Sequence, residues 1–298
     1  MAPAATAPTF ELLKWTESGT ELEALSSQPV TCLSPDPQSA TLVRAGEALF
    51  NTPTLLGGQA AKAGLNCASC HVNGRDNPHF ALAGVSDRPG TADVTNSFFS
   101  AARGNGRFDP VTIPDLATPG KISRDPSSKA LEPFIRNLIV EEFGGHEPSA
   151  TTLDALAAYV RAIRSCPEGG KTRVSRKLED QLALIQAGVM GAVEMEARGD
   201  RQASQLLVAA ARHQLGLLSE RYAGPSLKRE RLALLEASRG LQDLVTLAET
   251  PSEFAKKAAG WLISFDKNVG ERLVRKGPKS LYDSGQLANA LGTKSAPK

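Results

Sequence analysis

Two cysteines and a histidine lie within five consecutive residues of this chain, Cys67-Ala68-Ser69-Cys70-His71. The spacing C-x-x-C-H is typical of covalent attachment of a c-type haem, in which the two thiols add across the vinyl groups and form thioethers. The adjacent imidazole then binds the iron as the proximal ligand. The motif therefore predicts one covalently attached haem c, held by Cys67, Cys70 and His71.

Two other chemistries also use a C-x-x-C pair. A zinc site would need a second pair of ligands at metal spacing, and the remaining cysteines, Cys32 and Cys166, stand alone in the sequence. A redox dithiol of thioredoxin type would need a βαβ setting, and no strand-rich pattern surrounds the motif. Haem attachment is therefore the better interpretation.

The composition limits the class of protein and its partners. The chain has 298 residues, of which 41% are hydrophobic and 22% charged, as in an ordinary globular protein with room for two domains. Its 34 Lys and Arg residues nearly balance 32 Asp and Glu residues, so no bulk charge points to nucleic acid. No run of eighteen apolar residues occurs, so we expect no transmembrane segment.

The compartment follows from the predicted haem. Residues 1–8 contain neither the basic nor the apolar region of a secretory leader. Thioether attachment of haem normally follows export, so we infer a periplasmic or otherwise exported protein whose leader is absent from this sequence. In an oxidising compartment Cys32 and Cys166 are expected to form a disulfide, with two unrelated buried thiols as the alternative.

Hydrophobic periodicity and the positions of turn-forming residues divide the chain into four parts. Residues 1–38 are predicted to be an N-terminal arm on the surface, 39–166 a haem domain, 172–276 a domain of helices, and 277–298 a C-terminal tail. The fold class is therefore all-α.

The haem domain is predicted to have three helices around a long irregular stretch. The helices span Ser39 to Phe50 with Ser39 as N-cap, Leu131 to Phe143, and Thr151 or Thr152 to Ile163. Turn residues dominate 72–128, and a long irregular stretch inside a compact domain usually wraps a functional group. Its apolar residues are expected to cover the porphyrin: Phe80, Leu82, Val94, Phe98, Phe99, Phe108, Ile113 and Leu116. Its arginines are candidates for pairing with haem propionates: Arg75, Arg88, Arg103 and Arg107.

Four helices are predicted beyond residue 172, over about 174–198, 200–222, 226–247 and 251–274. The short connections make neighbours antiparallel, which favours a four-helix bundle. This part has no cofactor signature, so we expect it to supply a docking surface for a protein partner or to cover one haem face. Residues 189–193 are apolar all round and should pack on the haem domain or on a second protein.

Three further runs strengthen the comparison with a known family: Arg44 to Phe50, Ile113 to Leu116, and Leu153 to Val160. With the haem motif, these runs resemble the haem domains of bacterial di-haem cytochrome c peroxidases and the related methylamine-utilisation enzymes. The resemblance covers about residues 40–165 and implies a cytochrome c fold in which Gly46 and Phe50 cross the last helix near Tyr159. Those enzymes carry two haem motifs and an axial Met, whereas this chain has one motif and no Met at 121–126. Their two-haem cycle is therefore not implied.

The sixth iron ligand decides between electron transfer and catalysis, because an open iron face can bind peroxide or gases. His79, eight residues past His71 in an Asn-Pro turn, is the candidate distal ligand. An open or water-bound face is an alternative, as are the side chains of His146, Met190, Met195 and His213.

Three functions remain open at this point. We favour a mono-haem electron carrier with a redox partner protein over an enzyme. The alternative is a peroxidase-like oxidoreductase with an open distal site, for which Glu141, Glu142 and His146 are the candidate acid–base residues. The third is a haem-bearing structural or sensor subunit.

Overall fold

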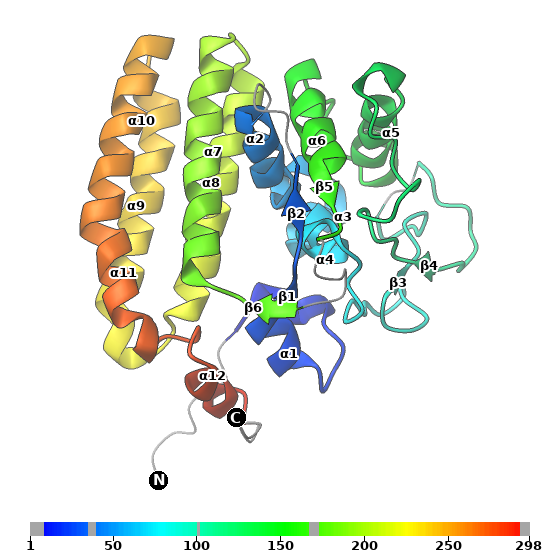
Figure 1. Cartoon of the computed structure of the whole chain (residues 1–298), viewed down its shortest axis with the longest axis horizontal. Helices are drawn as coiled ribbons and strands as arrows, with labels where there is room; N and C mark the ends of the chain where they lie inside the picture. Colours follow the sequence, from blue (N-terminus) through cyan, green and yellow to red (C-terminus); the bar gives the residue numbers. More distant parts are fainter. Residues whose placement is uncertain (1–8, 35–39, 100–101, 167–172, 293–298) are drawn as a thin grey trace.

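The computed structural model describes residues 9–34, 40–99, 102–166 and 173–292, and within them the fold is all-α, as predicted. Long C-terminal helices stand beside a group of shorter helices that carries the haem motif (Figure 1). The shorter helices are α2 Ala40–Phe50, α3 Gly58–Ala63, α4 Cys67–Cys70, α5 Leu131–Asn137 and α6 Ala150–Ala162. Single helical turns lie between them: η3 Pro53–Leu55, η4 Val72–Gly74, η5 Pro126–Ser128 and the π-turn η6 Leu138–Glu142. The predicted cap Ser39 lies outside the described residues.

Helices α2 and α6 cross at the point that the resemblance implied. A Cβ atom added to Gly46 would lie 1.9 Å from the carbonyl oxygen of Ala155, so only glycine permits this approach of the two backbones. The rings of Phe50 and Tyr159 meet edge to face at 5.2 Å. Ser149 begins α6 by accepting a hydrogen bond from the Thr152 N–H.

The irregular stretch after the haem motif is confirmed. Among its described residues, 72–99 and 102–128, regular structure is limited to one short antiparallel pair, β3 Thr91–Ala92 with β4 Val111–Thr112, and to single turns. Four of the residues expected to cover the porphyrin are buried: Phe80, Phe99, Ile113 and Leu116. Phe98 and Phe108 are 39% and 55% exposed.

The C-terminal helices are α7 Leu178–Ala197, α8 Arg201–Arg221, α9 Lys228–Leu247, α10 Pro251–Phe265 and α11 Glu271–Lys276, with a π-turn Asp266–Gly270 (η8) between the last two. Asp200 caps α8 and Thr250 caps α10, as their positions predicted. Helix α7 packs on α8, α8 on α9, and α10 on both α9 and α7.

The first of these helices begins later than predicted. Val174 belongs to β6 Arg173–Ser175, which pairs with β1 Ser27–Pro29 of the N-terminal arm. The hydrogen bonds of this long-range pair fix residues 173–175 in an extended conformation, so α7 begins at Leu178.

Helix α7 also packs against α2, which joins the two parts of the molecule. Gly191 lies against Ala45, with 3.0 Å between an ideal Cβ at Gly191 and that of Ala45. Met190 beside it is 49% exposed. One continuous cluster of buried apolar side chains runs through both groups of helices.

The predicted surface position of the N-terminal arm is wrong. Phe10, Trp15 and Leu25 of the arm are buried. The arm contains η1 Glu11–Trp15 and α1 Glu21–Ser26, and the tail contains η9 Gly277–Lys279 and α12 Ser284–Ala290. Arm and tail share a small apolar cluster of Phe10, Leu25, Leu281 and Leu287. Residues 9–34 of the arm therefore contribute buried side chains to the fold.

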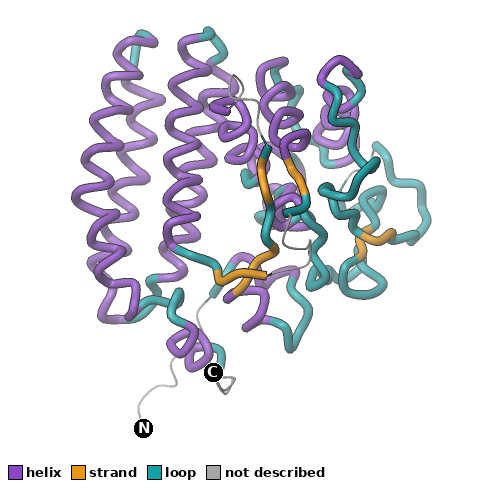
Figure 2. Tube along the Cα trace, in the orientation of Figure 1, coloured by secondary structure: helices purple, strands orange, loops and turns teal. Residues whose placement is uncertain are grey.

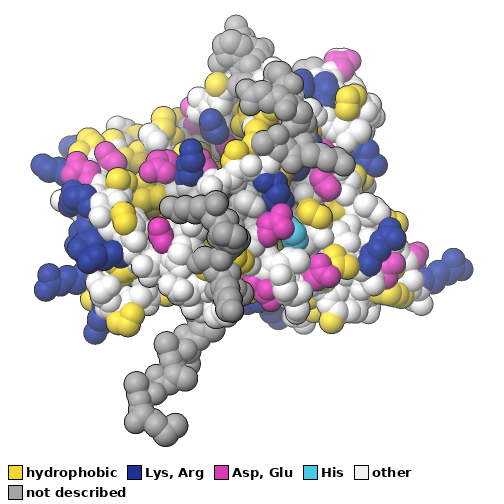
Figure 3. All heavy atoms as spheres, turned by 60° about the horizontal axis from the view of Figure 1, so that its bottom comes forward, with side chains coloured by type: hydrophobic (Ala, Val, Ile, Leu, Met, Phe, Trp, Pro, Cys, Tyr) yellow, Lys and Arg dark blue, Asp and Glu magenta, His cyan; other side chains and the backbone are white. Residues whose placement is uncertain are grey.

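The predicted disulfide between Cys32 and Cys166 is present, with a Cα–Cα distance of 5.1 Å. It lies beside the pair β2 Cys32–Leu33 with β5 Ile163–Arg164, one of the short strand pairs visible in Figure 2. No helix of the described residues has the length and hydrophobicity needed to cross a membrane. Acidic and basic side chains are both spread over the face shown in Figure 3.

Candidate functional site

The haem motif begins a short, well-capped helix. Gly64 ends α3 in the left-handed region at φ 86°, and the chain then turns into α4. The Asn66 side chain accepts a hydrogen bond from the Ser69 N–H, and the Ser69 hydroxyl accepts one from the Asn66 N–H, both at 3.1 Å. This reciprocal cap fixes the turn, and the spacing of three places Cys67 and Cys70 on the same side of α4.

His71 directly follows that turn and is held from the side of its Nδ1 atom. Nδ1 lies 3.0 Å from the carbonyl oxygen of Pro114, to which an N–H at this position donates. Burial lowers the pKa of His71 to about 4, although the Pro114 carbonyl and the Asp115 charge oppose the shift. The ring is therefore neutral near pH 7 and keeps the Nε2 lone pair for a metal.

An ion pair between buried Arg75 and half-buried Asp115 holds the segment that carries Pro114. Arg75, which is 4% exposed, donates to both carboxylate oxygens of Asp115 at 2.7 and 2.6 Å, and to the carbonyl of Val30 at 3.1 Å. Asp115 also accepts from the Ala117 N–H at 2.8 Å. Bidentate arginine–carboxylate pairs are geometrically specific, so this one orients the backbone at Pro114. Arg75, a sequence candidate for a propionate partner, thus forms a bidentate pair with a protein carboxylate.

The four cysteines fall into two chemical classes. Cys32 and Cys166 form a disulfide. Cys67 and Cys70 are free thiols, although only two residues lie between these two cysteines. Burial raises the pKa of both free thiols to about 12, so they are protonated near neutral pH. Within the described parts of the chain, no group of three or more His, Cys, Asp or Glu side chains is arranged to hold a metal ion.

These residues fit a c-type haem on three counts. Two unpaired thiols lie one turn apart, a neutral imidazole follows them directly, and its other nitrogen is anchored to a backbone carbonyl. The Phe50 ring lies 6.4 Å from the His71 ring, between centroids, and contributes an apolar wall.

The candidates for a sixth ligand are dispersed. His79 lies beside Glu23 of α1, with Nε2 3.5 Å from the carboxylate, and its carbonyl accepts from the Glu17 N–H. It therefore faces the N-terminal arm, and ligation would require it to leave Glu23. Of the other candidates, His146 is exposed, Met190 is half-exposed, Met195 is fully buried, and His213 lies next to Glu11.

Of the three candidate acid–base residues, Glu142 has the most unusual environment. It is 7% exposed at the end of η6, its Oε2 has no hydrogen-bond partner among the described residues, and Oε1 is 3.4 Å from Arg103 Nε. Burial raises the pKa of Glu142, with Arg103 opposing. Glu141 is 44% exposed and pairs with Arg136.

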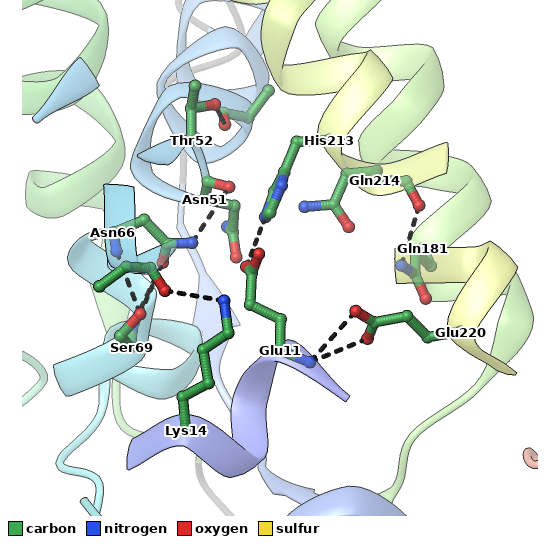
Figure 4. Close-up of polar contacts among 12 residues, drawn as sticks. Glu11, Lys14, Asn51, Thr52, Asn66, Ser69, Gln181, His213, Gln214 and Glu220 are labelled. Atoms are coloured by element: carbon green, nitrogen blue, oxygen red, sulfur yellow. Dashed lines mark hydrogen bonds and ion pairs between the residues drawn. The ribbon is translucent and has the colours of Figure 1, made fainter. Parts of the chain in front are cut away.

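A second cluster of polar groups lies on the side of α4 that carries Asn66 and Ser69. A cavity of about 790 Å³ separates α4 from the C-terminal helices, and Glu11, Trp15, His213 and Glu220 line it. In Figure 4, Asn51 and Asn66 approach Glu11 from one side and residues of α8 from the other. Of Glu11, Trp15, His213 and Glu220, only His213 is a candidate from the sequence. The long-range packing of the arm on α8 leaves no local signal for the rest.

Comparison with protein-family models, with curated proteins and with solved structures finds no match. Functional assignment therefore rests on the geometry of the two clusters.

Proposed function

We propose that this chain is a mono-haem c-type cytochrome that transfers electrons to or from a redox partner protein. The observation that carries the proposal is the hydrogen bond between His71 Nδ1 and the Pro114 carbonyl, directly after two free thiols one turn apart. That bond fixes the ring orientation and its tautomer, so Nε2 is the nitrogen left to bind iron. When bound, the haem supplies a one-electron iron couple.

The protein's own contribution is rigid positioning. The capped helix α4 holds the two attachment points, and the Arg75–Asp115 pair holds the carbonyl that orients His71. The buried residues of 72–128 are proposed to exclude water from the porphyrin faces. A site that moves little between oxidation states keeps the reorganisation energy of electron transfer small.

The compartment and the identity of the two domains are also proposals. The Cys32–Cys166 disulfide supports an oxidising compartment, in agreement with an exported or periplasmic protein. We propose that residues 39–166 form a cytochrome c-like domain related to the di-haem peroxidase and methylamine-utilisation haem domains. Residues 172–276 would form a four-helix bundle, because each of α7, α8, α9 and α10 packs against two of the others.

The test is an optical spectrum of the exported, purified protein in both oxidation states, with and without carbon monoxide. A haem c spectrum that carbon monoxide leaves unchanged supports a six-coordinate electron carrier. A large shift on addition of carbon monoxide to the reduced form reveals an open face and favours the enzyme. Absence of any haem after expression with a haem-attachment system contradicts the proposal.

Replacing Asp115 by Asn should raise the midpoint potential by tens of millivolts. The change removes a negative charge next to the proximal histidine and leaves the positive charge of Arg75 uncompensated by Asp115, and both effects favour the reduced iron. Redox titration measures the shift. Asp266→Asn, which removes the same charge from the turn between α10 and α11, should leave the potential unchanged. A potential that falls or stays constant in Asp115→Asn would show that this pair does not act on His71.

A peroxidase-like enzyme is the second candidate, and the buried, incompletely paired Glu142 favours it. A buried carboxyl with a raised pKa can serve as the acid–base group that assists cleavage of an O–O bond. If so, Glu142→Gln should lower peroxide turnover by about 100-fold or more, whereas Glu141→Gln should leave it nearly unchanged. Lack of peroxide turnover by the unaltered haem protein rules this candidate out.

A further inference from the structure

The cavity behind the haem motif has no role in the proposed electron transfer. It has a volume of about 790 Å³ and is bounded by η1, by the Asn66 and Ser69 side of α4, and by α7 and α8. Cys67, Cys70 and His71 are not among the residues that line it. Its volume lies within the range of small-molecule sites and is far larger than a single ion needs.

Most charged groups that line the cavity are already neutralised or hydrogen-bonded within the protein. Arg44 pairs with Glu47 at 2.6 Å, and Asp180 accepts from the Gln28 side chain at 3.0 Å. Arg176 donates to the carbonyls of Ala24 and Ser27 at 3.0 and 3.1 Å, and Lys177 is exposed. Arg221 lies over the rings of Phe10 and Tyr282, each 5.2 Å away, and donates to the carbonyls of Leu25 and Leu281. These groups therefore have their interactions satisfied without a ligand.

Two carboxyl groups differ from the rest. Both oxygens of Glu220 share the single N–H of Glu11, at 3.1 and 3.2 Å. Oε1 of Glu11 lies 3.4 Å from Nε2 of His213, and that nitrogen forms no hydrogen bond within the described residues. Lys14, which extends from the same turn, donates to the carbonyl of Ala63. No lysine or arginine of the described residues forms an ion pair with Glu11 or Glu220.

Burial is the main cause of the shifted pKa values of Glu11, Glu220 and His213. Burial raises the pKa of Glu11 to about 7, the Glu220 charge adds to the rise, and Lys14 opposes it. Burial also raises the pKa of Glu220. Burial and Lys14 lower the pKa of His213 to about 4, so its imidazole is neutral near pH 7 and offers no counter-charge. A cation placed between the carboxyls would stabilise both in the ionised form.

The rest of the wall is apolar and aromatic. Trp15 is 4% exposed and lines the cavity, and its indole N–H has no partner among the described residues. Phe10, Leu217 and Tyr159 also line it. Aromatic and aliphatic walls of this kind can pack against the apolar body of a ligand.

We propose that the cavity binds an organic cation, with a primary ammonium group between Glu11 and Glu220 and an apolar body against Trp15. The ligand would touch the N-terminal arm, the rear of α4 and helices α7 and α8 at once. Binding would therefore stabilise the junction of the two groups of helices, with or without electron transfer.

The test measures binding of benzylammonium to the full-length protein by calorimetry, with benzyl alcohol as its uncharged counterpart. Benzylammonium should bind and benzyl alcohol should bind at least tenfold more weakly. Glu11→Gln and Glu220→Gln should each weaken benzylammonium binding about tenfold or more. Asp180→Asn, which changes a cavity carboxylate already bonded to Gln28, should alter it less than twofold.

The pH dependence gives an independent check. Benzylammonium prefers ionised Glu11, so its affinity should rise about tenfold between pH 6 and pH 8 as that carboxyl loses its proton. In Trp261→Phe protein, Trp15 is the one remaining indole, so its fluorescence should report binding even if a carboxyl variant folds poorly. Three results would overturn the proposal. They are equal binding of benzyl alcohol, no binding of benzylammonium at millimolar concentration, and unchanged affinity in both glutamine variants.

Discussion

Purified protein in which Cys67 and Cys70 are both replaced by serine should contain no covalently bound haem. Thioether bonds form only from thiols. The other two cysteines form a disulfide with each other and are far from α4 in the sequence, so they cannot replace Cys67 and Cys70. His71 could still bind iron reversibly, because its hydrogen bond to Pro114 does not depend on the cysteines. Haem staining after denaturing electrophoresis, together with extraction by acidified solvent, measures the covalent fraction.

The matched control replaces the other pair, Cys32 and Cys166, by serine. This variant also lacks two cysteines but keeps both attachment points, so it should retain the full content of covalent haem. Each single variant, Cys67→Ser or Cys70→Ser, should keep one thioether and show a shifted spectrum. Haem that survives extraction from the double variant would contradict the assignment of the motif.

The local features of the fold could be predicted because their causes are local. Asp200 and Thr250 cap helices where the sequence places a capping residue before a helical pattern. The irregular stretch 72–128 was also predicted, because its turn residues prevent regular hydrogen bonding along the chain. Gly46 was expected at the crossing of α2 and α6, and its backbone contact with Ala155 confirms this.

The N-terminal arm could not be predicted, because its structure depends on distant partners. Glu11 and His213 are 202 residues apart in the chain, and Ser27 pairs with Ser175. A pattern of a few apolar residues does not reveal whether such a segment is buried. The same long-range pairing holds residues 173–175 in an extended conformation, although helical periodicity predicts a helix from about residue 174.

The candidate site divides in the same way. The motif residues were predicted from spacing alone, and the structure adds the Pro114 carbonyl and the Arg75–Asp115 pair, which lie 40 or more residues away from their partners. The sequence could not place the sixth ligand, because any of several flexible segments could reach a haem. His79 remains a prediction, and in this structure it lies beside Glu23.

Removal of the Cys32–Cys166 disulfide should lower the free energy of unfolding by up to about 5 kcal/mol. The two cysteines are 134 residues apart, and in the chain-entropy model a bridge over so long a loop restricts the unfolded chain strongly. The folded state should change little, because the pairs β1–β6 and β2–β5 still hold the arm in place. The loss therefore acts mainly through the unfolded state.

The measurement is denaturant unfolding of the variant carrying Cys32→Ser and Cys166→Ser beside the unaltered protein, both loaded with haem to the same extent. The variant should unfold at a clearly lower denaturant concentration, while its haem spectrum in water stays the same. Because α4 and the Arg75–Asp115 pair do not involve either cysteine, a changed spectrum would mean that the bridge also positions the haem site. Equal unfolding midpoints for the two proteins would contradict a stabilising disulfide. The same holds if a protein lacking Cys67 and Cys70 shows two alkylatable thiols when it is unfolded without reduction.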